Sequence, residues 1–586
     1  MKDFFNNTIA SMCGTLLALV ITVSMIGLIV IGGFFGIIAL NSNMNQDIET
    51  TDHSILHLKF NESISDQRSV EPNFSTFTIE QKMGLYDILT KIKNAAEEDF
   101  ISGIYLDLSS LHTGLATIED IRSALIEFKK SGKFIVAHSE YYSHSTYYLA
   151  SVADKIYLTP AGGVEFTGLS SNIVFFKSLF DKIGVKPIVI RHGKFKSAVE
   201  PFLQDVISDA NREQTQKYVN SLWTTILKGI EDQRDIPEAK LNYYADALLI
   251  KNDLSALEYK LVDGLKYKDE VFAELKKLSN SDQLNLLPLK YYNQVPDFSY
   301  GSYGDEIAVI YATGSIVSGE GNEDMIGSES LSELIRSARE NSSVKAIVLR
   351  VNSPGGSALA SEVIWRETVL AQKAKPLIVS FGDVAASGGY YIACAADAIV
   401  AEPNTITGSI GVFGVLFNTK DIMNKFGVNV NTIRSNKFSD IANPTRPITD
   451  WEKSVLQDGV EEVYETFVKH VAEGRKTTFS AIDKIAQGRV WTGTDAKEIG
   501  LVDQLGGLND AIVLAAEKAF LKKYQVISYP EQNKLKAMIH EALGGVKVSV
   551  LSDELGDAYH IFKQVNELKT MKGVQARLPY FYKFNN

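Results

Sequence analysis

The sequence predicts two tandem α/β domains that follow a membrane-spanning helix, and three observations support this fold class. A charge-free, mostly apolar run covers residues 14–40. The chain after this run repeats itself in one long, ungapped register. Within each copy, short runs rich in β-branched residues alternate with segments of helical spacing. Such alternation is typical of a parallel sheet with crossover helices.

The composition excludes several classes of protein. The chain has 586 residues, of which 45% are hydrophobic and 22% charged, which is ordinary globular usage. The net charge of −12 argues against nucleic acid as a partner for most of the chain. The two cysteines, Cys13 and Cys394, cannot form a disulfide framework.

The apolar run 14–40 is long enough to span a bilayer, which takes about 20 residues. A cleaved signal peptide is the alternative, but its apolar region is only about 7–15 residues long. Residues 40–43 also make a poor cleavage site, so we expect an uncleaved anchor. Lys2 is the only basic residue before the run, and the next is Lys59. The positive-inside rule then places the N-terminus in the cytoplasm and most of the chain outside it.

The internal repeat has a period of 243 residues. Tyr147–Ile156 matches Tyr390–Ile399 (390 − 147 = 243), and Ile190–Phe195 matches Ile433–Phe438 (433 − 190 = 243). One register over this length indicates a duplicated domain.

The repeat defines the expected elements and domains. The polar, proline-containing stretch 287–302 is the expected boundary between the copies. The predicted strands are Ile104–Leu108, Phe134–Ala137 and Ile156–Leu158 in the first copy, and Ala346–Val351, Leu377–Ser380 and Ile399–Ala401 in the second. The predicted domains are a stub with the anchor (1–46), the first repeat (47–295), the second repeat (296–530) and a helical C-terminal extension (531–586).

The two copies differ where glycine-rich loops follow the strands. The second copy has Asn-Ser-Pro-Gly-Gly-Ser at 352–357 and Gly-Asp-Val-Ala-Ala-Ser-Gly-Gly at 382–389, and the first copy has neither. Ser387 aligns with His144 (387 − 243 = 144), and Lys196 aligns with Ser439 (196 + 243 = 439). The first copy therefore keeps a lysine without the serine, and the second copy keeps the serine without the lysine.

This pattern is typical of nucleophilic catalysis. Ser387 is expected at a strand-to-helix turn, beside the free N–H groups of the first helical turn. Gly388, together with Gly355 or Gly356 on the neighbouring loop, could bind an oxyanion through backbone N–H groups. A Ser-Gly-Gly sequence is also common as a simple helix cap. The complementary losses in the two copies favour the catalytic interpretation.

The base that would activate the serine is less clear from the residues alone. No histidine lies between His192 and His470, so a triad confined to the second copy is disfavoured, although His192 or His144 could reach across. Lys196 is the other candidate, and it can act only if burial keeps its amine neutral near pH 7.

Five motifs together carry a family resemblance, and they lie at 195–202, 352–356, 382–390, 405–412 and 488–493. With them the chain resembles the bacterial signal peptide peptidase A family in its long, tandem-repeat form. That family consists of membrane-anchored Ser/Lys endopeptidases of the Clp-protease/crotonase-like superfamily, whose domains are ββα spirals. The resemblance implies that Ser387 is the nucleophile, Lys196 the base and Ser409 the residue that orients the amine. It also implies oxyanion donors at Gly355 or Gly356 and at Gly388.

The resemblance further implies the biological setting. Substrates would be signal peptides left after secretory preproteins are processed, and the assembly would be a homotetramer. The chain would sit in the bacterial inner membrane with its bulk on the periplasmic side. No cofactor is expected, and the scattered histidines, with no H-E-x-x-H motif, argue against a metal enzyme.

The repeat predicts where such a site forms. In a one-copy relative the lysine would follow the serine by 52 residues (196 − 144 = 52), but Ser387 plus 52 is Ser439. The lysine must therefore come from the other copy, within one subunit or between two. Two alternatives remain at this stage. They are a crotonase-like hydratase or acyl-transfer enzyme and a non-catalytic membrane scaffold.

Overall fold

The computed structural model describes residues 52–60, 63–73, 78–292, 304–322, 325–529 and 573–578, with a few helical residues between 14 and 25. Most of the apolar run 14–40, on which the anchor prediction depends, lies outside these residues. Among the residues that are described, no helix combines the length and apolarity needed to cross a membrane.

The described chain falls into two compact units. The smaller unit contains residues 68–83, where β2 (Ser69–Asn73) pairs antiparallel with β3 (Thr78–Lys82). The larger unit contains residues 84–531, the segment 50–67 and the C-terminal residues from His560 onward. The second repeat, most of the first repeat and all candidate site residues therefore belong to the larger unit.

Each repeat builds its own sheet, which is parallel in the first repeat and parallel except for one antiparallel edge strand in the second, close to what the alternation of strands and helices predicts. The first repeat has the strand order β8-β6-β5-β4-β1-β9. These strands span Gly264–Leu265, Lys155–Val164, Phe134–Tyr142, Ile101–Asp107, Ser54–Lys59 and Leu286–Pro288. The helices α2 (Leu85–Glu97), α3 (Leu115–Lys129) and α4 (His144–Ala150) connect or flank them.

The second sheet has the order β20-β18-β16-β14-β10-β22, with β17 beside β16. These strands span Val490–Thr492, Ile406–Gly408, Leu377–Ala386, Val344–Ser353, Glu306–Thr313 and Gln525–Tyr529, and β17 is Ala398–Ala401. Its helices include α12 (Ala358–Ala374), α13 (Gly388–Ala393) and α15 (Asp450–Gly474). The expected tandem α/β architecture is confirmed, and most strands extend beyond their predicted ends.

A third sheet joins the two repeats, in the order β12-β13-β11-β15-β23-β19-β7. Its strands are Gly321–Asn322, Met325–Gly327, Ser315–Val317, Gly355–Ser357, Gln575–Arg577, Val412–Asn418 and Lys186–His192. β7 comes from the first repeat and pairs antiparallel with β19 of the second. The strand β23 lies in the C-terminal extension, which the sequence predicts to be helical. Its residues are extended because they pair with β15 and β19.

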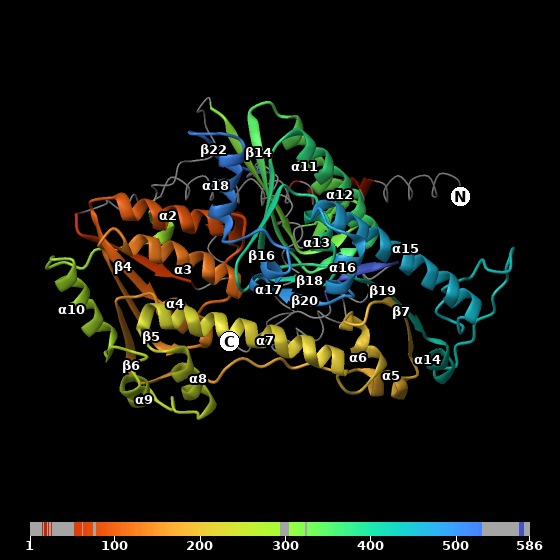
Figure 1. Ribbon diagram of the computed structural model, residues 1–586, viewed down its shortest axis with the longest axis horizontal. Helices are drawn as coiled ribbons and strands as arrows, with labels where there is room; N and C mark the ends of the chain where they lie inside the picture. The colour runs from red at the N-terminus through yellow and green to blue at the C-terminus, as the bar shows by residue number, and fades with distance from the viewer. Residues whose placement is uncertain are drawn as a thin grey trace. The chain divides into compact units, whose positions relative to one another are not determined.

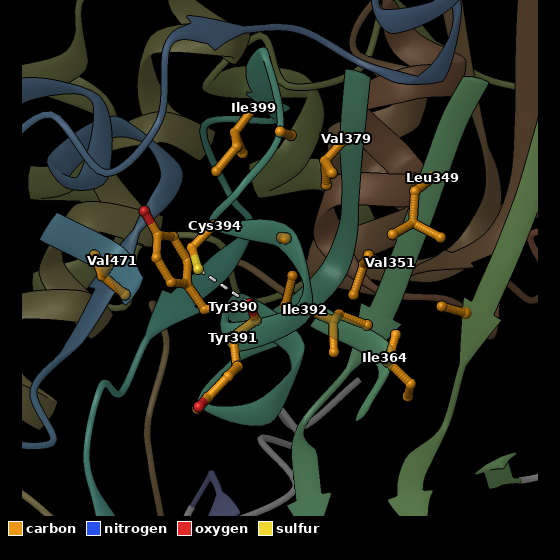
Figure 2. Close-up of a cluster of buried hydrophobic side chains, with 14 of the residues drawn as sticks. Leu349, Val351, Ile364, Val379, Tyr390, Tyr391, Ile392, Cys394, Ile399 and Val471 are labelled. Atoms are coloured by element: carbon orange, nitrogen blue, oxygen red, sulfur yellow. Dashed lines mark hydrogen bonds between the residues drawn. The ribbon is translucent and has the colours of Figure 1, made fainter. Parts of the chain in front are cut away.

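The core of the second repeat holds α13 in place (Figure 2). Tyr390 and Tyr391 at the start of this helix are almost completely buried, together with Leu349 and Val379 of the sheet. Cys394 at the end of the helix donates from Sγ to the Tyr391 carbonyl at 3.1 Å. Because α13 is fixed over its whole length, the turn that precedes it is fixed as well.

Buried polar bonds connect the two repeats. Arg350 on β14 has no exposed surface and pairs with Asp66 at 2.8 Å and with Asp120 of α3 at 3.3 Å. Asp383, at the end of β16, accepts the N–H groups of Ala116 and Thr117 in the first turn of α3, both at 3.0 Å. A carboxylate at a helix N-terminus is electrostatically favourable. The bonds therefore set the first repeat against the loop that leads to Ser387.

The longest helix of the first repeat also reaches the second. Helix α7 (Asp209–Arg234) contacts α4 of its own repeat and β20 of the other. Figure 1 shows it in yellow, running from α4 toward α6 (Glu200–Leu203). Its N-terminal half thereby lies beside the segment that carries Lys196.

Candidate active site

Ser387 occupies a strained turn between β16 and α13. Its backbone has φ 55° and ψ −112°, in a region that residues other than glycine rarely adopt. The Ser387 N–H donates to the Gly408 carbonyl at 2.8 Å, which ties the turn to β18. Such strain costs on the order of 1–3 kcal/mol and persists only where the surroundings enforce it. It is a common feature of functional turns.

Lys196 comes from the first repeat and meets Ser387 in the larger unit. It follows β7, its side chain is completely buried, and its Nζ lies 2.8 Å from Ser387 Oγ. Nζ also lies 3.0 Å from both the carbonyl oxygen and the hydroxyl oxygen of Ser409. The predicted serine, lysine and second serine are thus together within hydrogen-bond distance.

Burial lowers the pKa of the Lys196 amine well below its ordinary value. The cause is desolvation, because the charged ammonium loses its water shell in this position. A neutral amine has two N–H donors and one lone pair. It can donate to both oxygens of Ser409 and accept the hydroxyl proton of Ser387. This arrangement is what a general base requires.

The segment around Lys196 is held by contacts that sequence reasoning did not identify. Gln214 on α7 is buried and donates from Nε2 to the Phe195 carbonyl at 3.0 Å and to Ser197 Oγ at 2.9 Å. Gln214 also accepts the N–H of Val490 from β20. A helix residue of the first repeat therefore links the lysine segment to the second repeat. A glutamine in a long amphipathic helix carries no sequence signal for such a role.

A glycine packs directly against the lysine. A Cβ built on Gly488 would lie 2.6 Å from the Lys196 Cβ. Gly488 belongs to the motif at 488–493 that contributes to the family resemblance, so the motif itself was the available signal. Any side chain at this position would displace the lysine from Ser387.

The two glycine loops meet beside Ser387, as predicted for an oxyanion site. A Cβ on Gly355 would lie 2.6 Å from the Gly388 nitrogen, so the loops are in direct contact. The Gly355 N–H donates to Ser353 Oγ at 3.1 Å. The Gly355 N–H is therefore already engaged within its own loop.

The two histidines left open as alternative bases lie elsewhere. His192 pairs with Glu461 and stacks on Tyr464, with ring centroids 3.7 Å apart. His144 accepts the Thr167 N–H at 3.1 Å. Ser387 Oγ instead contacts Lys196 Nζ and, at 3.3 Å, the Gly411 carbonyl.

The first repeat does not form a second site of this kind. Ser439, which aligns with Lys196, is exposed, and its hydroxyl donates to the nearby Asn436 carbonyl at 3.0 Å. Burial lowers the pKa of His144, which aligns with Ser387, to about 4. The imidazole is therefore neutral at pH 7 and acts as a buried hydrogen-bond acceptor.

Comparison with known families matches both copies of the repeat to one family. The sequence profile of Peptidase family S49 matches residues 127–282 and again residues 370–522. The starts of the two matches are 243 residues apart (370 − 127 = 243), which is the period of the internal repeat. The profile of the Clp protease family matches residues 302–407.

Three similar proteins extend over most of the chain. Protease 4 of Salmonella typhi is 39% identical over 490 residues, which cover 81% of this chain and 78% of that protein. Protease 4 of Haemophilus influenzae is 32% identical over 582 residues, covering 96% and 91%. The chloroplastic Serine protease SPPA of Arabidopsis thaliana is 33% identical over 535 residues, covering 90% and 77%.

The α/β repeats, the matched profiles and these relatives define a serine-type peptidase that acts on peptide substrates. Both halves of the chain match the same profile, as expected of a duplicated peptidase domain. The chain belongs to Peptidase family S49, and its relatives support the signal peptide peptidase type within that family.

Proposed function

We propose that this protein is a membrane-anchored serine endopeptidase that uses a Ser387/Lys196 dyad to degrade signal peptides left after secretory preproteins are processed. The 2.8 Å distance between Lys196 Nζ and Ser387 Oγ carries the proposal. Complete burial of the amine supports it, because desolvation lowers the pKa of Lys196 and so favours the neutral form that a general base needs.

The reaction is acyl transfer through the serine. Neutral Lys196 takes the hydroxyl proton as Ser387 Oγ attacks the substrate carbonyl, and the N–H groups of Gly356 and Gly388 bind the oxyanion. The protonated lysine then gives its proton to the leaving amine, which leaves an ester on Ser387. Lys196, neutral again, activates water to hydrolyse that ester. Ser409 holds the amine in line through its two oxygens.

The membrane location is part of the same proposal. The run 14–40 would anchor the chain in the bacterial inner membrane, with its bulk on the periplasmic side. An anchored peptidase is close to apolar peptides that remain in the bilayer after secretion. This proximity, together with the family resemblance, favours signal-peptide remnants as the substrates.

Assembly into a ring of copies, a homotetramer by resemblance, is supported by two segments that form no strand within this chain. Within the chain, β7 of the first repeat pairs with β19 of the second. The equivalents of these strands under the 243-residue shift are 429–435 (186 + 243 to 192 + 243) and 169–175 (412 − 243 to 418 − 243), and neither forms a strand. Residues 429–435 are all exposed, and Ile433 is 99% exposed. Pairing 429–435 of one copy with 169–175 of the next would repeat the internal contact head to tail, and such contacts form a ring when the rotation between copies closes.

Covalent labelling tests the dyad. A serine-reactive fluorophosphonate should label the purified full-length enzyme at Ser387, and the label should be located by peptide mass spectrometry. Lys196→Met should abolish labelling at neutral pH, whereas the matched change Ser439→Met in the other repeat should not. Labelling elsewhere, or undiminished labelling of Lys196→Met, would overturn the dyad. Degradation of a synthetic signal peptide in detergent micelles tests the substrate class.

A further inference from the structure

The loop 486–490, which connects α16 (Phe479–Ile485) to β20, holds the backbone that carries the lysine. The carbonyl of Gln487 accepts the N–H of Phe195 at 2.8 Å. Phe195 directly precedes Lys196, so this bond fixes the chain beside the base. The loop belongs to the second repeat and the lysine to the first, so the bond also connects the two repeats.

The same loop holds the turn at Ser409. The carbonyl of Arg489 accepts the N–H of Ser409 at 2.7 Å, and the N–H of Gly488 donates to the carbonyl of Ile410 at 2.8 Å. Ser409 in turn accepts from Lys196 Nζ at both of its oxygens. The loop therefore sets the base and the residue that orients its amine relative to each other.

Gln487 has an unusual backbone conformation for a residue with a side chain. Its φ is 54°, in the left-handed region, and the φ of the following Gly488 is 79°. A left-handed residue just after a helix is common, but it is usually glycine, which adopts this region without steric cost. A glutamine persists there only where its surroundings enforce the conformation.

Tyr464 on α15 and Asp483 on α16, the Gln487 clamp, bind both the side chain and the backbone of Gln487. The amide Nε2 of Gln487 donates to Asp483 Oδ1 at 2.6 Å and to the Tyr464 hydroxyl at 3.1 Å. The backbone N–H of Gln487 donates to the same hydroxyl at 3.3 Å, and that hydroxyl donates to Asp483 Oδ1 at 2.5 Å. The Tyr464 hydroxyl therefore uses its one donor and its two acceptor positions on this contact.

The Gln487 clamp also contacts the strand that leads to the lysine. His192, the last residue of β7, stacks on the Tyr464 ring with the ring centroids 3.7 Å apart. His192 also pairs with Glu461, which precedes Tyr464 on α15 by about one helical turn. Tyr464 is only 2% exposed, so its ring is buried where the two repeats meet. The clamp therefore fixes Gln487 against the strand that ends just before Lys196.

We propose that Gln487 is a positioning residue for Lys196, and that Tyr464 and Asp483 act on the base through it. This inference rests on the proposed Ser387/Lys196 function. Without the clamp, the strained loop relaxes, which moves the amine away from Ser387 and admits water to it. Proton transfer from the serine then slows, and the pKa of the lysine rises toward its ordinary value because desolvation is weaker.

The labelling rate of Ser387 by a fluorophosphonate tests this role in the purified full-length enzyme, measured from about pH 6 to about pH 10. Gln487→Met keeps the length of the side chain but removes its amide donors. The labelling rate and kcat on a fluorogenic peptide should each fall by about tenfold with KM unchanged. The pH at which the labelling rate rises should also move upward. Gln504→Met, at an exposed glutamine of the same repeat, is the matched control and should behave like the wild type.

Gln487→Gly separates positioning from a simple helix end. Glycine adopts the left-handed conformation without strain, so this variant should unfold at a urea concentration close to that of the wild type. Its labelling rate should nevertheless fall as in Gln487→Met, because the clamp has lost its partner. A wild-type labelling rate in Gln487→Gly would show that the loop needs only the backbone conformation, and it would overturn the role of the side chain.

The clamp residues give a second test that leaves Gln487 in place. Tyr464→Phe keeps the ring on His192 and removes the hydroxyl, and its loss in labelling rate should match that of Gln487→Met. The double variant should lose little more than either single variant, because both changes break the same contact. Asp483→Asn retains an acceptor oxygen and should keep most of the rate that Asp483→Leu loses. Additive losses in the double variant would overturn the clamp.

The outcomes separate this proposal from the proposed function. If Lys196→Met is labelled as fast as the wild type, the dyad is wrong and the role of Gln487 falls with it. If labelling depends on Lys196 but Gln487→Met keeps the wild-type rate and pH profile, only the positioning role is overturned. A loss in Gln487→Met that appears in KM, with the pH profile unmoved, overturns the positioning role as well.

Discussion

His144 in the first repeat and Ser387 in the second begin equivalent helices, yet the two turns are built differently. In the first repeat, Ser143 caps α4 by accepting the Thr146 N–H, and the backbone of this cap is ordinary extended chain. In the second repeat, Ser387 itself precedes α13 with a positive φ and no side-chain cap. The first repeat therefore gains a capped helix start, and the second keeps a strained turn. Retaining an uncapped, strained turn in only one of two copies indicates a functional requirement there.

The segment around Lys196 and its equivalent around Ser439 differ in burial. Lys196 is buried because β7 pairs with β19 and because Gln214 holds the adjacent backbone. The equivalent segment around Ser439 has no such strand beside it in this chain and is exposed. The comparison teaches that the lysine segment needs a strand of the neighbouring repeat in addition to the contacts of its own repeat. A lysine placed at 439 would need a second subunit to become buried.

The largest effect should come from the serine. Ser387→Ala removes the nucleophile, so peptide hydrolysis should fall by about 10⁴-fold or more, as in other serine hydrolases. The equivalent change in the first repeat, His144→Ala, should keep the rate within a few-fold. Steady-state kinetics on a fluorogenic peptide measure both, and circular dichroism confirms that each variant folds. A large loss in His144→Ala with folding intact would show that the first repeat takes part in the chemistry.

The second effect concerns the base. Lys196→Met should lower the rate by about 10²- to 10⁴-fold, the usual contribution of a general base. Ser439→Met is the matched control and should be close to wild type. In the wild type, the rate should rise with pH through the lowered pKa of the lysine, because only the neutral amine can accept the proton. This rise should be absent in Lys196→Met, and a pH profile shared by both enzymes would contradict the role of Lys196.

A smaller effect is expected from Gln214, which acts by positioning Lys196. Gln214→Leu removes the bonds to Phe195 and Ser197, and we expect kcat to fall by about tenfold with KM unchanged, since a misaligned base affects the chemical step. Gln216→Leu is the control, because Gln216 lies on the same helix and is exposed. A purely structural role would instead lower the unfolding midpoint without separating kcat from KM.

Much of the architecture could be predicted because the internal repeat identifies equivalent positions in the two copies, which the composition alone does not. The 243-residue register located both domains, and the complementary losses at 144 and 439 singled out Ser387 and Lys196. Period-2 and helical patterns found most elements, although strands such as Leu377–Ala386 continue past their apolar runs. They do so because pairing with β18 extends the ladder into the Ser387 loop.

Other features depend on tertiary contacts that leave no local pattern. Gln214 looks like any polar residue of a long helix, and only the packing of α7 against β20 gives it a partner. The sequence around the C-terminal segment 575–577 has helical spacing, but pairing with β15 and β19 makes the segment a strand. Tertiary pairing overrides local propensity in such cases.

The last effect is on stability and not on the rate, and its sign follows from the buried amine. Because folding lowers the pKa of Lys196, the unfolded chain binds one more proton than the folded chain between that lowered value and about 10.4. In this window Lys196 makes the free energy of unfolding rise by about 1.4 kcal/mol per pH unit. Lys196→Met lacks this contribution, so its stability relative to wild type should decline by that slope as the pH is raised from 7 to 9. Urea unfolding of both chains measures the difference, with Ser439→Met as the control that shows no slope. A pH-independent difference would mean that the amine keeps its charge in the folded protein, and a charged lysine could not take the proton from Ser387.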